Sequence, residues 1–272
     1  MFRDCFRKLA VFFRWIVQEA VRHPMGCLMI LWGMSLALKL LCLWGEPILG
    51  RDASFYVYSA REWHETGIYP VHVIPPMLYT LIRGGMFCGF DAEVAGWIVN
   101  IGLASFLVFV TYGIAFEAVK SKKIALVAAL FTAIHPVIND LAIEIQREIP
   151  YLFFAGLTLW MAVAALQRKK WFLWGGAGIF CALSMVTRYE SAELVILIPL
   201  IILIQAFGRK IPWKNAAGYL GIFYLAAVSL FFAFFYLTGT QKFLKRYDAY
   251  GTYKIKRVEN WYEMRFKKEK KQ

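Results

Sequence analysis

Residues 94–117, VAGWIVNIGLASFLVFVTYGIAFE, form an almost unbroken apolar stretch with a single acidic residue at its end. About 20 consecutive apolar residues are enough to carry a helix through the hydrocarbon core of a bilayer. Further segments of this kind lie at 25–47, 123–139, 149–167, 171–187, 191–207 and 216–237. The sequence therefore predicts an all-α, polytopic membrane protein with about seven transmembrane helices, whose membrane domain covers residues 25–237.

The composition of the whole chain agrees with this fold class. Of its 272 residues, 60% are hydrophobic and 18% are charged, and the mean hydropathy is +0.53. A soluble domain of this size would have too little polar surface to cover its core. The 5 cysteines show neither paired secretory spacing nor a CxxC pattern, so neither a disulfide scaffold nor a zinc site is expected. The net charge of +13 arises from basic residues at the ends of apolar segments, and we expect no nucleic-acid partner.

The distribution of basic residues predicts the orientation of the spans. Fourteen Lys and Arg residues precede the first span or lie in the connections near 120, 168 and 209, whereas five lie on the opposite side. The positive-inside rule therefore predicts a multi-pass protein of the cell (inner) membrane with a cytoplasmic N terminus. Residues 1–24 are expected to form a basic amphipathic segment that contacts membrane lipids. An odd number of spans would place the basic tail, 238–272, outside, although its charge favours the cytoplasm.

The connection at 48–92 is the longest and is expected outside the cell, where it has two helix signals. Asp52 is a candidate N-cap for a helix over residues 53–66 that ends at Gly67. We expect this helix to lie along the membrane interface with its aromatic residues toward lipid. One face of the helix carries Phe55, Tyr56, Ser59 and Trp63, of which three are aromatic. Pro75–Pro76 begins a second short helix that ends near Gly84–Gly85.

Three motifs follow one another at this predicted outer face. The first is Asp52-x3-Tyr56-x3-Ala60-Arg61-Glu62-x4-Gly67, followed by Pro75-Pro76-Met77-Leu78-Tyr79. The others are Arg147-Glu148-Ile149-Pro150 and Thr187-Arg188-Tyr189-Glu190. Together they resemble the GT-C glycosyltransferases, in the branch with protein O-mannosyltransferases and lipid A aminoarabinose transferases. The resemblance covers residues 25–240, but Ile74 stands where several relatives have Lys, and relatives usually continue beyond the last span.

The resemblance implies transfer of a sugar from a polyprenyl-phosphate-linked donor to a glycan, lipid or protein acceptor, generally with inversion. A carboxylate must take the proton of the acceptor hydroxyl, and the resemblance makes Asp52 the candidate base and Glu148 a second catalytic acid. A guanidinium matches the leaving phosphate, with Arg188 as first choice and Arg61 and Arg147 behind it. The other expected substrate-binding residues are Tyr56, Tyr79 and Glu190. No cofactor is expected; some GT-C branches use a divalent metal between acids, but Asp52 with Glu148 is too small a set of ligands to predict a metal site.

Each assignment has a structural alternative. Asp52 can be a helix cap only, Glu148 an ion-pair partner of Arg147, and Arg188 with Glu190 a salt bridge that closes a turn. His64 and His72 are expected at the surface or against an acceptor, and His135–Pro136 predicts a kink in the third span. At the level of function, the alternatives are a non-catalytic member or partner subunit on the same frame and, less favoured, a small transporter or flippase.

Overall fold

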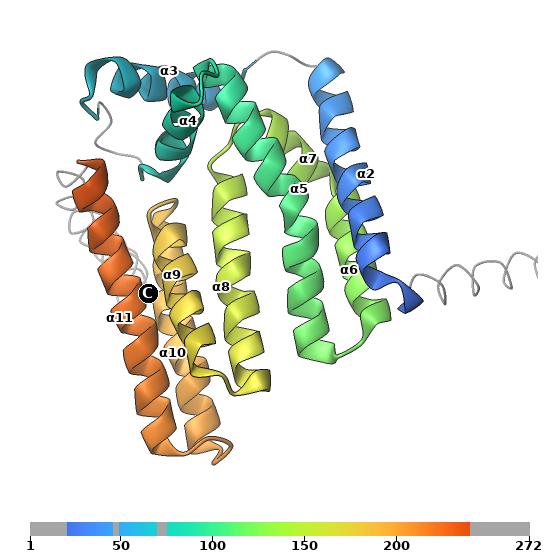
Figure 1. Cartoon of the computed structure of the whole chain (residues 1–272), viewed down its shortest axis with the longest axis vertical. Helices are drawn as coiled ribbons and strands as arrows, with labels where there is room; N and C mark the ends of the chain where they lie inside the picture. Colours follow the sequence, from blue (N-terminus) through green and yellow to red (C-terminus); the bar gives the residue numbers. More distant parts are fainter. Residues whose placement is uncertain (1–20, 46–48, 70–74, 240–272) are drawn as a thin grey trace, which may run out of the picture.

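The computed structural model describes residues 21–45, 49–69 and 75–239, and all regular elements in these ranges are helical (Figure 1). The bundle consists of α2 (Pro24–Gly45), α5 (Ala92–Val119), α6 (Lys122–Ile134), α7 (Pro136–Ile143), α8 (Glu148–Arg168), α9 (Trp171–Met185), α10 (Ala192–Phe207) and α11 (Trp213–Thr238). Two further helices, α3 (Arg51–Thr66) and α4 (Met77–Phe87), form a layer at one end of it. We call this end the α3–α4 end.

Each of the seven predicted apolar segments is mainly helical within the described residues, which confirms an all-α polytopic membrane protein. Among the described residues, five helices are individually long and apolar enough to cross a membrane: Pro24–Gly45, Ala92–Val119, Glu148–Arg168, Tyr189–Phe207 and Trp213–Thr238. A sixth span results if α6 and α7 are counted together, since they bend by 47° at the predicted His135–Pro136 kink. The remaining helix, α9, has 15 residues and is shorter than a full span. It runs between α8 and α11 (Figure 1).

Glycine allows the helices of the bundle to approach closely. A Cβ atom on Gly178 of α9 would lie 2.3 Å from the carbonyl oxygen of Phe223 on α11. A Cβ on Gly113 of α5 would lie 2.1 Å from the ring of Trp160 on α8. Small residues at helix contacts are typical of membrane proteins, where close packing replaces the hydrophobic drive between helices.

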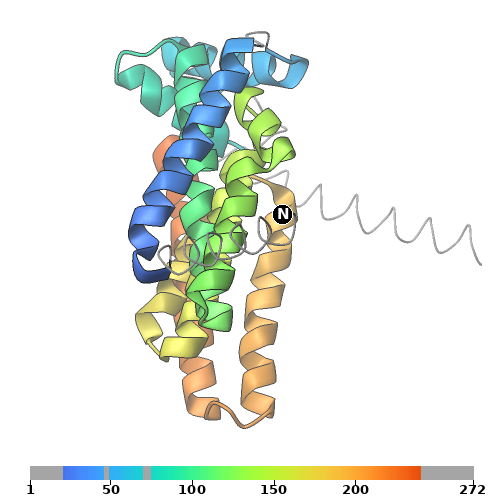
Figure 2. The ribbon, with the colours of Figure 1, turned by 90° about the vertical axis from the view of Figure 1, so that its right-hand side faces the viewer.

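The short basic connections lie together at the end opposite α3 and α4 (Figures 1 and 2). They join α5 to α6, α8 to α9 and α10 to α11, and α2 also begins at this end. We call it the basic end, because it carries the lysines and arginines of these three connections, which the orientation prediction used. The predicted amphipathic segment and basic tail lie outside the described residues, except for their innermost residues.

Helix α3 differs from the prediction in two respects. Its N-cap is Gly50, and Asp52 lies within the first turn without a side-chain capping bond, so the predicted cap is wrong. The predicted lipid-facing surface is also wrong, because Tyr56, Ser59 and Trp63 are buried. The end of the helix at Gly67, in left-handed conformation with φ of 70°, is as predicted.

The burial of that face follows from helical periodicity. The buried residues of α3, Ala53, Tyr56, Val57, Ala60 and Trp63, recur at spacings of three and four and pack together with Leu78, Tyr79 and Ile82 of α4. Exposed aromatic residues lie on the other side of α3, at Phe55 and Tyr58. Helix α4 begins after Pro76, as predicted, and continues two residues beyond Gly85 to Phe87.

Candidate active site

The turn between α9 and α10 is attached directly to the start of α4. The backbone N–H of Met77 donates a hydrogen bond of 3.0 Å to the carbonyl of Val186. The turn itself is closed by the hydroxyls of Ser184 and Ser191, whose oxygens are 2.7 Å apart. This arrangement holds Arg188, the central residue of the third motif, beneath the α3–α4 layer.

A second turn, between α7 and α8, carries the Arg147-Glu148 motif and is held by two side chains of α5. The indole Nε1 of Trp97 donates to the carbonyl of Ile143 at 3.0 Å, and Nδ2 of Asn100 donates to that of Gln146 at 2.9 Å. Both contacts join residues 46 positions apart in the chain. The start of α8 is therefore positioned by α5.

The same turn contains a strained residue. Ile145 has a φ of 51°, in the left-handed region that β-branched residues rarely occupy, at a cost of about 1–3 kcal/mol. Its side chain is fully buried among α3 and α4 residues. A Cβ on Gly96 of α5 would lie 2.9 Å from Cδ1 of Ile145, so this glycine makes room for it. Burial of the isoleucine thus offsets the strain and fixes the approach to Glu148.

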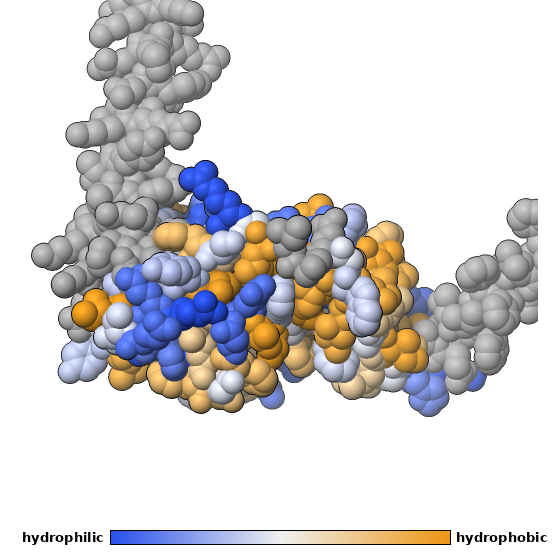
Figure 3. Space-filling model, turned by 90° about the horizontal axis from the view of Figure 1, so that it is seen from above, coloured by the Kyte–Doolittle hydropathy of each residue, from blue (hydrophilic) through white to orange (hydrophobic). Residues whose placement is uncertain are grey.

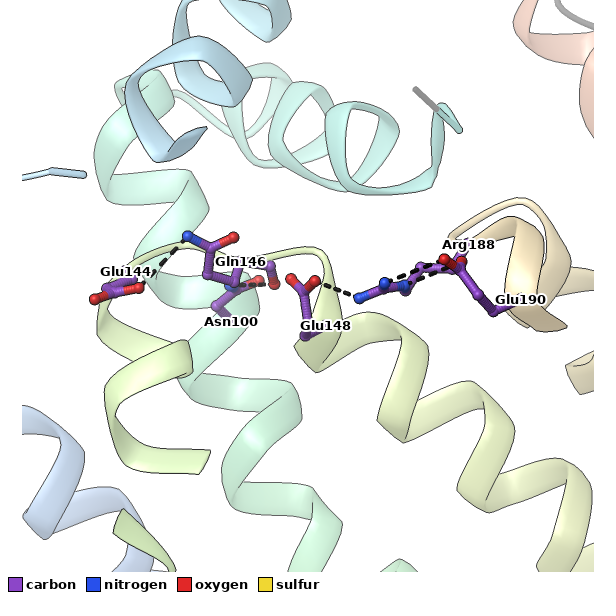
Figure 4. A network of polar contacts seen from close by, with 6 residues as sticks. All are labelled: Asn100, Glu144, Gln146, Glu148, Arg188 and Glu190. Carbon is purple, nitrogen blue, oxygen red and sulfur yellow. Dashed lines mark hydrogen bonds and ion pairs between the residues drawn. The ribbon is translucent and has the colours of Figure 1, made fainter. Parts of the chain in front are cut away.

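Glu148, Arg188 and Glu190 form one ion-pair network across the two turns (Figure 4). Nη1 of Arg188 donates to Oε1 of Glu148, and its Nε and Nη2 donate to the two oxygens of Glu190 at 3.3 and 3.4 Å. Burial lowers the pKa of Arg188, but the hydrogen bond with Glu190 and the two negative charges outweigh burial and raise it overall. Arg188 is consequently charged and committed to two carboxylates.

Glu148 keeps one oxygen for another partner. Its Oε1 is bound by Arg188, whereas its Oε2 is buried and has no hydrogen-bond partner among the described residues. An unpaired buried acceptor costs about 1–3 kcal/mol, and such atoms in native proteins call for an explanation. A bound hydroxyl would supply the missing donor.

Two tyrosines of the α3–α4 layer face the same charges. The rings of Tyr56 and Tyr79 meet edge to face at 5.7 Å, and the hydroxyl of Tyr79 is buried without a partner among the described residues. Burial raises the pKa of both phenols, so both remain neutral donors. The charges that act on the Tyr56 hydroxyl are those of Arg147, Glu148, Asp52 and Arg188.

Asp52 and Arg147 are the charged members of this group that have no hydrogen-bonding or ion-pairing partner in the described ranges. Asp52 is exposed in the first turn of α3, and Arg147 is half-buried at the start of α8. Arg61, the other predicted phosphate ligand, is instead bound through Nη2 to both oxygens of Asp91, at 2.8 and 3.0 Å. The site therefore brings together all of the predicted residues except Arg61.

The surface at this end is mixed in character. Viewed onto the α3–α4 end, hydrophilic residues gather in a patch bordered by hydrophobic ones (Figure 3). Within the ranges described, no group of three or more His, Cys, Asp or Glu side chains is arranged to hold a metal ion. The functional groups that the described site residues present are carboxylates, guanidinium groups and phenols.

The described helices form a membrane bundle in which the acidic and arginine motifs converge under a two-helix layer, and together with the family match this identifies a GT-C-type glycosyltransferase fold. The chain belongs to the dolichyl-phosphate-mannose-protein mannosyltransferase family, which it matches over residues 73–238. It is also similar to a protein of Aquifex aeolicus (strain VF5) described only as uncharacterized, with 26% identity over 204 residues. That similarity covers 71% of this chain but 40% of the relative, so the chain spans less than half of that protein's length.

The family match includes the second and third motifs but begins after α3. Asp52 and Tyr56 are therefore linked to the site by geometry alone. No sequence pattern indicated that Arg147 has no carboxylate partner among the described residues, or that Ile145 has a left-handed backbone conformation. Which charged side chains pair, and which backbone conformation a turn adopts, both depend on tertiary contacts between the turns. No local sequence pattern encodes these contacts.

Proposed function

We propose that the protein transfers a sugar from a polyprenyl-phosphate-linked donor to an acceptor hydroxyl at the α3–α4 end. The observation that carries the proposal is the convergence of groups that have no partner among the described residues: Asp52, Arg147, the Tyr79 hydroxyl and one oxygen of Glu148. A site of this composition offers a proton acceptor, a phosphate ligand and hydrogen-bond partners for a sugar. Membership of a glycosyltransferase family supports the same reaction class.

In the proposed reaction, the acceptor hydroxyl attacks the anomeric carbon of the donor sugar and loses its proton to Asp52. The new carbon–oxygen bond forms as the bond from the anomeric carbon to the phosphate oxygen breaks, and attack from the opposite side inverts the anomeric configuration. The bonding electrons pass to the phosphate, which leaves as polyprenyl phosphate. Arg147 stabilises the charge that develops there, since no carboxylate in the described part of the chain neutralises its guanidinium.

Arg188 has a different part in this proposal from the one that the motif suggested. It is bound to Glu148 and Glu190 and would have to release a carboxylate before it could bind phosphate in fork geometry. We therefore assign the phosphate first to Arg147 and regard Arg188 as a positioning residue for Glu148. Glu148, through Oε2, and the hydroxyls of Tyr56 and Tyr79 would then hydrogen-bond the sugar.

The proposed orientation places the basic end in the cytoplasm and the α3–α4 end outside, in the inner membrane. Single cysteines at positions 169 and 65, each in a cysteine-free background, test this in intact cells with an impermeant thiol reagent. We expect labelling at 65 and protection at 169. The reverse pattern would mean that the active site faces the cytoplasm.

The activity is tested with the purified chain, a short-chain polyprenyl-phosphate mannose and an envelope extract from a strain that lacks the gene. Mass spectrometry should detect mannosylated acceptor together with free polyprenyl phosphate, and the Glu148→Gln variant provides the matched control. Donor binding without release of polyprenyl phosphate would favour a non-catalytic member of the family. The sugar is identified in parallel from envelope glycans and glycolipids of the deletion strain.

A further inference from the structure

A second arginine site lies in the α3–α4 layer, outside the group of residues described above. Arg83 of α4 is placed between two aromatic rings: its guanidinium carbon is 4.5 Å from the ring centre of Trp63 and 5.1 Å from that of Phe87. The imidazole of His64 packs against Phe87 at 4.7 Å between ring centres. An arginine held in this way is oriented before any ligand binds.

Two polar atoms of this cluster are left without a partner in the part of the chain that the structure describes. The Nε of Arg83 and the Nδ1 of His64 are buried and have no hydrogen-bond partner in the described parts of the chain. No carboxylate there forms an ion pair with Arg83, and burial lowers the pKa of its guanidinium below the ordinary value. Arg61, on the same layer, is by contrast neutralised by Asp91. The two rings therefore orient the Arg83 guanidinium, but no anion among the described residues binds it.

The packing of α4 on α5 indicates where this cluster lies relative to the membrane surface. A Cβ on Gly85 would lie 2.7 Å from Cβ of Ala95, so the C-terminal half of α4 contacts the first turn of α5. With 28 residues, α5 is about 42 Å long and exceeds the hydrocarbon thickness of about 30 Å, so it extends beyond the hydrocarbon core. We expect its first turn, which contacts the α3–α4 layer, to reach the lipid headgroups. Arg83 precedes Gly85 by two residues on α4, and we expect it at a similar depth.

The rim of the cluster is apolar and exposed. Phe87 is 68% and Phe90 46% accessible, and both follow Arg83 on the way to α5. Exposed aromatic residues at this depth are typical of the membrane–water interface. An anion that meets Arg83 here would be carried by a molecule with both a charged group and an apolar part.

We propose that Arg83, stacked between Trp63 and Phe87 and assisted by His64, binds the phosphate of an anionic phospholipid headgroup at the membrane surface. A guanidinium presents two N–H groups in the geometry that phosphate oxygens accept. The lipid tails lie against Phe87 and Phe90, and the bound lipid anchors the α3–α4 layer to the bilayer. This site is separate from the proposed catalytic residues and does not depend on the proposed activity.

The test is a titration of the purified chain in detergent micelles with dioctanoyl phosphatidylglycerol, followed by hydrogen exchange. Peptides that cover residues 83–90 should become protected, and Arg83→Gln should move the midpoint about tenfold higher. The matched control is Arg51→Gln, which removes an exposed arginine of the same layer that has no ring contact among the described residues. Its midpoint should stay within about twofold of the parent, while the connections at the basic end provide an internal reference in every variant.

Four outcomes would overturn the proposal. Equal midpoints for Arg83→Gln and the parent would show that Arg83 does not bind the lipid, and an equal loss in Arg51→Gln would indicate general electrostatics. Protection by inorganic phosphate alone, at the same phosphate concentration, would identify a site for a free anion. If Arg83→Gln does not fold, the titration of the parent still decides, since absence of lipid-dependent protection at 83–90 contradicts the proposal.

Discussion

The two ends of the bundle each carry a cluster of glutamate and arginine, and the clusters differ in how completely they are paired. At the basic end, Glu117 of α5 is 1% exposed, and each of its oxygens has a partner: Oε1 is bound by Arg168 of α8, Oε2 by Lys120. Two half-exposed cations thus neutralise one buried acid. This cluster joins α5 to α8 and leaves no atom of Glu117 available.

At the α3–α4 end, the side chains of Glu148 and Arg188 are 29% and 21% exposed. One oxygen of Glu148 is unpaired, Asp52 and Arg147 have no ion-pair partner in the described ranges, and a strained residue precedes the motif. The cluster at the basic end is closed, since every oxygen of its glutamate is paired, and we interpret it as structural. The cluster at the α3–α4 end is open, since some of its polar groups have no partner among the described residues, and it can therefore bind a ligand. We therefore expect substitution of a glutamate at the α3–α4 end to lower activity, and substitution of a glutamate at the basic end to lower stability.

The largest effect is expected for Asp52→Asn. Because Gly50 is the N-cap, the substitution removes a carboxylate near a helix N terminus but no capping bond, at a cost of about 0.5 kcal/mol. Loss of the general base should slow transfer about 100- to 10,000-fold while donor binding is retained. Single-turnover transfer and donor binding by the purified variant provide the measurement.

The reference for Asp52→Asn is Glu65→Gln, which removes an exposed acid from the last turns of the same helix. Its transfer rate should match that of the parent within about twofold. If Asp52→Asn also transfers sugar at nearly the parental rate, the base is another residue, and Glu148 becomes the first candidate.

The second prediction compares Glu148→Gln directly with Glu117→Gln. Glu148→Gln should lower transfer about 10- to 100-fold, since the site loses a charge that orients substrate, and should change stability by less than about 1 kcal/mol. Glu117→Gln should do the opposite and lower the free energy of unfolding by about 1–3 kcal/mol with parental transfer per folded molecule. Thermal unfolding and active-site-normalised rates separate the two outcomes.

Equal stability losses in both variants would remove the distinction between a closed and an open cluster. In that case Glu148 would be a structural ion-pair partner, as one of the interpretations of the sequence allowed.

The third prediction separates the two arginines of the open cluster. Arg147→Gln should raise the KM for the polyprenyl-phosphate donor about tenfold or more, because it removes the guanidinium that has no carboxylate partner. Arg188→Gln should chiefly lower kcat and stability, since Glu148 and Glu190 lose their common partner. Arg188→Lys should restore stability in part but not the fork geometry. If the donor KM rises only in the Arg188 variants, Arg188 and not Arg147 is the residue that binds the donor phosphate.

The seven helical segments and the three motifs were accessible from the sequence because each depends on a long local pattern. Apolar stretches, the Pro75–Pro76 start of α4 and the His135–Pro136 bend all have a local physical cause. Even the inward face of α3 was encoded in the spacing of Ala53, Tyr56, Ala60 and Trp63, but aromatic residues near a membrane were interpreted as lipid-facing. That error arose because the spacing of residues identifies which of them share a helix face, but does not identify whether that face contacts lipid or protein.

The pairing of charges was not accessible in the same way. Whether Arg61, Arg147 or Arg188 is available depends on which carboxylate the fold places beside each of them. Asp91 lies 30 residues from Arg61, and Glu148 lies 40 from Arg188. A sequence motif names the residues that meet, whereas the assignment of partners requires the arrangement of the turns.

The smallest effect is expected for Arg61→Gln, which tests whether pairing decides function. Arg61 and Asp91 are 42% and 55% exposed, and an exposed ion pair contributes about 0.2–1 kcal/mol. Asp91 retains its other role, because its side chain accepts from the backbone N–H of Glu93 and caps α5, and this hydrogen bond helps keep the pKa of Asp91 low. The variant should therefore unfold within about 1 kcal/mol of the parent, and its donor KM should change less than about twofold. Asp91→Asn serves as its control, since it weakens the same ion pair while keeping a capping oxygen. A tenfold rise in donor KM for Arg61→Gln, without one for Asp91→Asn, would show that Arg61 leaves its carboxylate to bind phosphate, and an existing ion pair would then no longer exclude an arginine from the site.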